Sequence, residues 1–172
     1  MPPLSNQSPA QEPVLAWQDI DEAPLRALLA RYGLAVVALA ADAPVPGSFW
    51  GAPETGLIGA CLYVRPDTPV HSILHEACHY VCMDARRRAR LHTDAGGDYD
   101  EENAVCYLQI LLGGMLEQVG RARIARDMDR WGYSFRLGSA GAWFARDADD
   151  ARRWLEDHEL VRQGRPTWTV RA

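Results

Sequence analysis

The sequence predicts an α+β fold in which a small sheet is followed by a buried helix and then by a helical C-terminal half. Two short apolar runs, residues 34–40 and 57–64, are typical of buried strands. Residues 70–83 come next, contain neither Gly nor Pro, and carry apolar side chains at helical spacing. Because helical patterns dominate the rest of the chain, strands and helices do not alternate as they would in a parallel α/β fold.

The flanking helices are predicted from their start and stop signals. Asp21 lies near the start of an apolar-periodic segment that ends at Gly33, and acidic residues begin the segment that follows Gly97. We therefore expect helices at residues 19–32, 98–113, 119–131 and 147–161, with a polar connection at 84–97 and an irregular segment at 133–140.

The length and composition are those of a single globular domain. The chain has 172 residues, of which 48% are hydrophobic, enough to bury a core without disulfides or a structural metal. Residues 1–16 are rich in Pro, Ser and Gln, so we expect a disordered tail there and one domain over residues 17–172. The four cysteines lie in apolar patterns and are expected to be reduced.

Composition also argues against several classes of partner. The net charge is −5, and the arginine cluster at residues 86–90 is too short to indicate a nucleic-acid surface. No stretch resembles a signal peptide, and no run approaches the ~20 apolar residues of a membrane span. We expect a cytoplasmic protein without nucleic-acid or membrane partners. The sequence does not indicate an oligomeric state.

The most informative motif is H-E-x-x-H at residues 75–79, within the predicted helix. His75 and His79 are four positions apart, so they lie on one helix face and their imidazoles can converge on one metal ion. Thr68 and Pro69 just before this segment are a helix start signal, with Thr68 expected to cap the first free amides. Neutral imidazole is a natural ligand of Zn²⁺, and Glu76 is placed to act on a zinc-bound water.

A catalytic zinc site with two histidines needs a third protein ligand and one position for water. The candidates lie in the acidic first turn of the next predicted helix, where Glu101-Glu102-Asn103-Ala104 reads E-x-x-A. Here the chain, over about residues 57–112, resembles the zincin metallopeptidases of the gluzincin type, in which a glutamate of such a pattern completes H-E-x-x-H. The match indicates Glu101, which shares a helix face with Ala104. Glu102 is the neighbouring alternative.

The resemblance implies a zincin-like minimal core, one Zn²⁺, and hydrolysis of a peptide or protein substrate. His75, His79 and Glu101 would be the metal ligands, and Glu76 would be the general base. The predicted strand at residues 57–64, if it forms the sheet edge above the cleft, could pair with an extended substrate.

The sequence also leaves other side chains and other functions open. His71 and Cys82 share the ligand face, but a solvent-facing histidine and a core cysteine are the simpler interpretations. Tyr133 could stabilise an oxyanion, although no sequence feature favours it over Tyr99 or Tyr107. The alternatives to an enzyme are a zinc-binding regulatory or interaction protein on the same scaffold, and a metal-free helical protein in which the motif is accidental.

Overall fold

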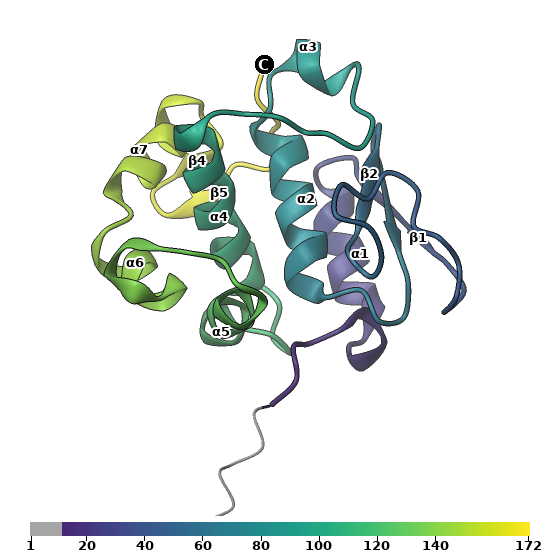
Figure 1. Ribbon diagram of the computed structural model, residues 1–172. Helices are drawn as coiled ribbons and strands as arrows, with labels where there is room; N and C mark the ends of the chain where they lie inside the picture. Colours follow the sequence, from purple (N-terminus) through teal and green to yellow (C-terminus); the bar gives the residue numbers. More distant parts are fainter. Residues whose placement is uncertain (1–11) are drawn as a thin grey trace, which may run out of the picture.

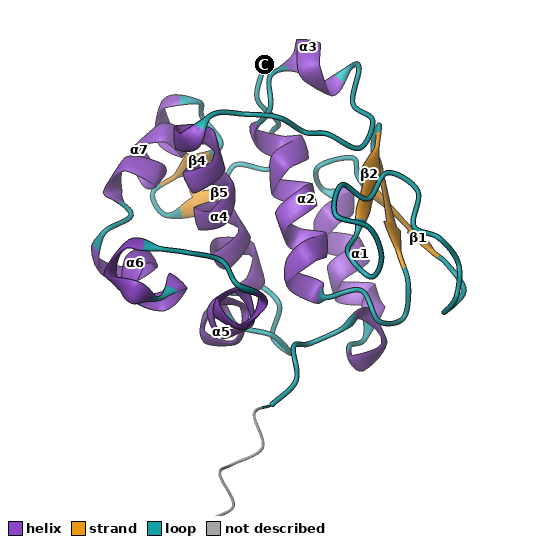
Figure 2. Ribbon diagram, in the orientation of Figure 1, coloured by secondary structure: helices purple, strands orange, loops and turns teal. Residues whose placement is uncertain are grey.

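The computed structural model describes residues 12–172, and it has the predicted α+β architecture (Figure 1). In Figure 2 the three-stranded sheet lies at the right of the molecule, and a short two-stranded hairpin lies among the helices of the C-terminal half, which is mainly helical. The helices are α1 (Glu22–Ala30), α2 (Val70–Cys82), α3 (Ala85–Arg88), α4 (Tyr99–Gly113), α5 (Arg121–Trp131), α6 (Ala140–Arg146) and α7 (Asp149–Asp157), with short 3-10 turns η1 (Trp17–Asp19) and η2 (Arg136–Gly138). The strands are β1 (Ala35–Ala38), β2 (Gly56–Ile58), β3 (Cys61–Val64), β4 (Val161–Arg162) and β5 (Arg165–Pro166).

Helix α2 is the centre of the fold, between the sheet and the C-terminal helices (Figure 1). Its side chains Val70, Ile73, Leu74, Ala77 and Val81 are fully buried, as the helical spacing predicts. The helix packs against β2 and β3 on one side and against α4 and α5 on the other. A helix enclosed in this way is fixed along its length, so the side chains it carries are held in defined positions.

The sheet differs from the predicted one at residues 57–64. This run is not one strand but a hairpin, in which β2 and β3 pair antiparallel from Ile58 opposite Cys61. The chain reverses at Gly59-Ala60, and Gly59 has a φ of 57°, which glycine adopts without strain. The strand order is β1-β3-β2, with β1 parallel to β3.

The expectation that this run offers a free edge to substrate is also wrong. Strand β3 is the central strand, so its two edges are used within the sheet. The outer edge of β2 is covered by residues 91–93: Thr93 N donates to Leu57 O at 3.0 Å, and Gly59 N donates to Leu91 O at 3.0 Å. The long polar connection before α4 supplies this cover.

Two further expectations, for residues 12–16 and for the cap of α2, are wrong. Of the tail predicted to be disordered, residues 1–11 lie outside the described residues, but residues 12–16 are ordered against the domain. Leu15 N donates to Asp127 Oδ2 at 3.0 Å, and Val70 N donates to Leu15 O at 2.8 Å. Thr68 does not cap α2 with its side chain, because its hydroxyl accepts from Arg65 N at 2.8 Å instead.

The predicted helices are present, with differences in extent. The connection at 84–97 contains the short helix α3, whose Asp84 side chain accepts from Arg87 N. The last predicted helix is shorter, since α7 ends at Asp157 and the β4–β5 hairpin follows. Helix α6 was not predicted, and its buried Trp143 anchors it to the core. None of the described helices is long and apolar enough to cross a membrane.

Candidate metal centre

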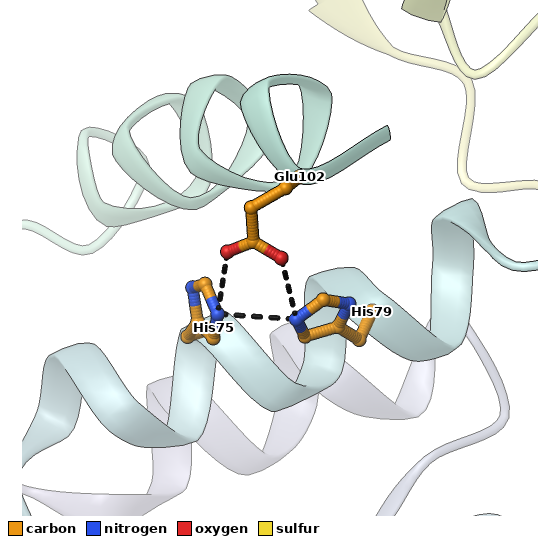
Figure 3. A group of neighbouring side chains, drawn as sticks. All are labelled: His75, His79 and Glu102. Atoms are coloured by element: carbon orange, nitrogen blue, oxygen red, sulfur yellow. Dashed lines mark hydrogen bonds and ion pairs between the residues drawn. The ribbon is translucent and has the colours of Figure 1, made fainter. Parts of the chain in front are cut away.

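His75, His79 and Glu102 converge between α2 and α4 (Figure 3). The two imidazole Nε2 atoms lie 3.1 Å apart. Glu102 spans them with its carboxylate, Oε1 lying 3.2 Å from His75 Nε2 and Oε2 lying 3.2 Å from His79 Nε2. Three potential ligand atoms from two packed helices therefore point to one position.

The trio has the donor types and nearly the dimensions of a zinc site. A tetrahedral site with bonds of 2.0–2.1 Å has ligand atoms roughly 3.4 Å apart, so the three side chains need to open only slightly to accept an ion. Two imidazoles and one carboxylate are a typical donor set of a catalytic zinc, which leaves one position for water. The residues fit the metal that the motif predicts.

Local sequence places Glu102 in the first turn of α4. Helix α4 begins at Tyr99, and its cap Asp98 accepts from Glu101 N at 2.9 Å. Glu102 thus lies in the first turn, where the helix dipole favours a carboxylate. Beyond it, the small buried side chains Ala104 on α4 and Ala77 on α2 are fully enclosed in the core that the two helices share.

The structure does not place Glu101, the predicted third ligand, with the histidines. Glu101 is only 3% exposed and forms a bidentate pair with Arg87, whose two terminal nitrogens each lie 2.8 Å from its oxygens. Arg171 adds a third contact at 3.3 Å. The predicted helix phase was wrong by one residue, roughly 100° around the axis. The arginine partners come from distant parts of the chain, so no local pattern revealed them.

The charges of the trio are complementary. Burial acts to raise the pKa of Glu102, but hydrogen bonds with His75 and His79 outweigh it and hold this pKa well below its ordinary value. The pKa of His75 is raised well above 6.5: burial opposes the charged form, but the Tyr133, Cys106 and Glu102 side chains together favour it. The cluster therefore favours a positive charge between its members, supplied by a proton or by a metal ion.

Glu76, the predicted base, lines the groove beside the trio without belonging to it. Its pKa is raised, chiefly by burial, although His79 and His75 act in the opposite direction. A carboxylate whose pKa is raised accepts a proton more readily near neutral pH. Its position and its basicity both suit the role that the motif indicates.

Gln109 of α4 was not singled out from the sequence, yet it holds one of the histidines. Its Nε2 donates to the main-chain O of His71 at 2.8 Å, which fixes the orientation of the amide. Its Oε1 is then the atom that lies 2.9 Å from His75 Nδ1, and it accepts a hydrogen bond from the Nδ1–H group. With a proton on Nδ1, Nε2 is the atom of His75 that can bind a metal. His79 differs, because its buried Nδ1 has no hydrogen-bond partner among the described residues.

Of the three tyrosines considered, Tyr133 alone lies at the site. Its ring is edge-on to His75 with centroids 5.4 Å apart, and its hydroxyl lies 3.3 Å from His71 Nδ1. Burial raises the pKa of Tyr133 to about 12. Tyr99 is 68% exposed on the surface, and Tyr107 stacks on Phe144.

The remaining candidates of the ligand face are not part of the trio. His71 is fully buried rather than exposed to solvent, and burial, followed by the charge of His75, lowers its pKa to about 3. It is therefore a neutral side chain behind the site. Cys82 is also fully buried and belongs to the core, as expected, and all four cysteines are free.

Two adjoining cavities of about 350 Å³ each lie beside the trio, and we refer to them together as the groove and to each as one of its halves. The two halves share the side chains of Trp50, His75, Glu76 and Glu102. One half continues along residues 93–97, and the other continues to the end of α5. Phe49 and Trp50 form an exposed edge-to-face pair on its rim, with exposed fractions of 54% and 77%. Large exposed aromatic side chains at a groove are typical of binding surfaces.

Comparisons with known proteins found no relative: no protein-family model, no curated protein and no solved structure matches this chain.

Proposed function

We propose that this protein is a zinc-dependent metallopeptidase of the zincin type, with His75, His79 and Glu102 as metal ligands and Glu76 as general base. The observation that carries the proposal is the convergence of the three ligand atoms within 4.8 Å of one another, beside a groove that Glu76 also lines. When bound, Zn²⁺ supplies Lewis acidity, which lowers the pKa of a bound water towards about 7 and polarises a carbonyl oxygen.

Glu76 performs the proton transfers in this proposal. Its carboxylate accepts a proton from the water as the water oxygen forms a bond to the carbonyl carbon. The same carboxyl group then returns the proton to the amide nitrogen as the C–N bond breaks, so that acid and amine products form. The burial that raises its pKa favours the first transfer near neutral pH.

Gln109 and the groove contribute orientation. Gln109 keeps the proton of His75 on Nδ1, which presents Nε2 to the metal in one tautomer. The groove continues on both sides of Glu76, so an extended peptide can place residues on either side of the bond to be cleaved. A site with cavities on both sides of Glu76 suits an endopeptidase better than an enzyme that trims chain ends.

The experiment has two parts, a metal analysis and a turnover assay. Protein purified without chelators should contain about one zinc per chain, and His75→Ala or His79→Ala should lose it. Glu76→Gln should keep the metal and the fold while hydrolysis of denatured casein or a peptide library falls by roughly 10²–10⁴-fold, because only the basic carboxylate is removed.

Glu117→Gln is the matched control, since Glu117 is exposed and lies outside the groove. Equal cleavage by wild type and Glu76→Gln would exclude Glu76 as the base. Zinc binding without cleavage of any peptide by the wild type would favour the zinc-binding regulatory or interaction protein instead. Absence of zinc, with no uptake on its addition, would refute the proposal.

A further inference from the structure

The half of the groove that extends to the end of α5 is lined by three large aromatic side chains. They are Trp50, in the loop before β2, and Trp131 and Tyr133, at the end of α5. Trp131 is 40% exposed although its ring is large, and Trp50 is 77% exposed. Exposed indole rings that face a common space are available to a ligand rather than to the core.

A carboxylate completes this lining. Glu54 lines the same half of the groove, and Trp131 Nε1 donates a hydrogen bond to its Oε1. This contact holds the Glu54 carboxylate beside the Trp131 ring and leaves its other oxygen free of hydrogen bonds within the described part of the chain. No ion pair to an arginine neutralises Glu54 among residues 12–172.

The lining of this half contains the carboxylates of Glu54, Glu76 and Glu102 together with His75, and none of the residues that line it within the described chain is an arginine. Glu102 is paired with the two histidines, whereas Glu54 has no cationic partner among the described residues. Glu102 and Glu76 are assigned to the metal and to catalysis, so the charge of Glu54 has no role in the proposed chemistry. Aromatic faces with an adjacent carboxylate are the surroundings that bind an organic cation, because the ring quadrupole and the carboxylate both attract positive charge.

We infer that this half of the groove is a subsite for a lysine or arginine side chain of an extended peptide substrate, with the aliphatic stem against Trp50 and Trp131 and the charge at Glu54. This inference rests on the proposed function, because only a peptidase would have a peptide as its substrate. Lys and Arg have long apolar stems and charged ends, which match a pocket that is aromatic along its walls and acidic at one point. The other half, along residues 93–97, is lined by Phe49 and Trp50 but by no ring from α5 or the residues after it, and its own acidic residue, Asp94, accepts a hydrogen bond from Gly96 N.

Binding, measured apart from cleavage, tests the subsite. Zinc-loaded Glu76→Gln keeps the groove without turnover, so its affinity for fluorescent peptides can be measured by anisotropy. The peptides form pairs that differ only in lysine or its neutral isostere norleucine at one position. We expect the lysine peptide to bind about 10-fold more tightly, and the difference to shrink as salt is raised.

Charge reversal supplies a second measurement. Adding Glu54→Arg should reverse the preference, so that a glutamate peptide binds more tightly than the lysine peptide. Trp50→Leu should keep apolar contact but lose most of the preference for lysine over norleucine. Glu117→Arg introduces the same charge outside the groove and should leave the preference unchanged.

The outcomes separate this inference from the peptidase proposal. Equal affinity for the lysine and norleucine peptides, or an unchanged preference in Glu54→Arg, would overturn the subsite. Cleavage by the wild type without any preference for basic residues would overturn it while the peptidase proposal stands. Selective binding of lysine peptides that the wild type never cleaves would support the subsite and contradict the peptidase proposal.

Discussion

Two adjacent glutamates at the start of α4 have opposite surroundings. Glu101 is buried and held by the guanidinium groups of Arg87 and Arg171, so the protein itself supplies its counter-charge. Glu102 is about half exposed and faces His75 and His79, whose charge depends on bound protons. A carboxylate with permanent cationic partners is structural, whereas one that faces imidazoles, which can exchange a proton for a metal ion, is available to that ion.

The Glu101 cluster also explains how the groove is shaped. Arg87 links Glu101 to the main-chain O of Ala95, in the segment that lines one half of the groove. Gly97 has a φ of 109°, and a Cβ there would lie 2.9 Å from Glu101 Oε1, so the chain needs glycine at this close approach. The ion pair therefore positions the wall of the groove, while Glu102 faces into it.

The sharpest test is the same substitution at both positions. Glu102→Gln should lower the affinity for zinc by more than roughly 100-fold, the upper range for residues that only support a ligand, because a direct anionic ligand is lost. Glu101→Gln should retain one zinc per chain. Equilibrium dialysis with a zinc indicator measures both. Metal loss in Glu101→Gln but not in Glu102→Gln would show that the assignment from the structure is wrong.

For stability, Glu101→Gln is expected to have the larger effect and Glu102→Gln the smaller one. Glu101→Gln leaves Arg87 and Arg171 without their buried partner, so the free energy of unfolding of the metal-free protein should fall by about 3 kcal/mol. Glu102→Gln should change it by less, since Glu102 is about half exposed. Urea denaturation monitored by tryptophan fluorescence measures this difference. Equal destabilisation by the two variants would mean that the two glutamates have the same structural role.

A substitution of Gln109 tests whether zinc binding depends on the hydrogen bond that orients His75. Gln109→Met is similar in size but removes both hydrogen bonds, so the affinity for zinc should fall about 10–100-fold. Leu108→Met is the matched control, because Leu108 is a fully buried neighbour in the same helix and its hydrocarbon side chain cannot form a hydrogen bond. An equal loss of zinc affinity in both variants would indicate general loosening of α4 instead of lost orientation.

The smallest expected effect is a pH dependence of zinc stabilisation. The raised pKa of His75 contributes stability to the metal-free protein below about pH 6.5, and this contribution is lost as the pH rises through the folded value. The lowered pKa of Glu102 contributes stability above about pH 4.5, which is lost only in stronger acid. The rise in Tm on zinc addition should therefore increase from pH 5.5 to pH 8, because the competing proton leaves. If zinc raises Tm by the same amount at pH 5.5 and at pH 8, this prediction is wrong.

The correct and incorrect sequence predictions differ in the range of the contacts on which they depend. The α+β class is confirmed, and His75 and His79 face the same way because four residues make about one helical turn. The choice of Glu101 failed because the partners of Glu101 are 14 and 70 residues away in the chain. The hairpin at residues 56–64 had a local signal in Gly59-Ala60, but the apolar run concealed it.

The sequence by itself determined the features that depend on backbone periodicity and local composition: the α+β class, the helix that carries H-E-x-x-H, and the acidic first turn of α4. Only the tertiary structure decided which glutamate meets the histidines, which side chain holds His75 Nδ1, and which segment covers the edge of β2. The physical reason is that a helix fixes angles between its own side chains, whereas its rotation against another helix depends on all the contacts in which both are buried.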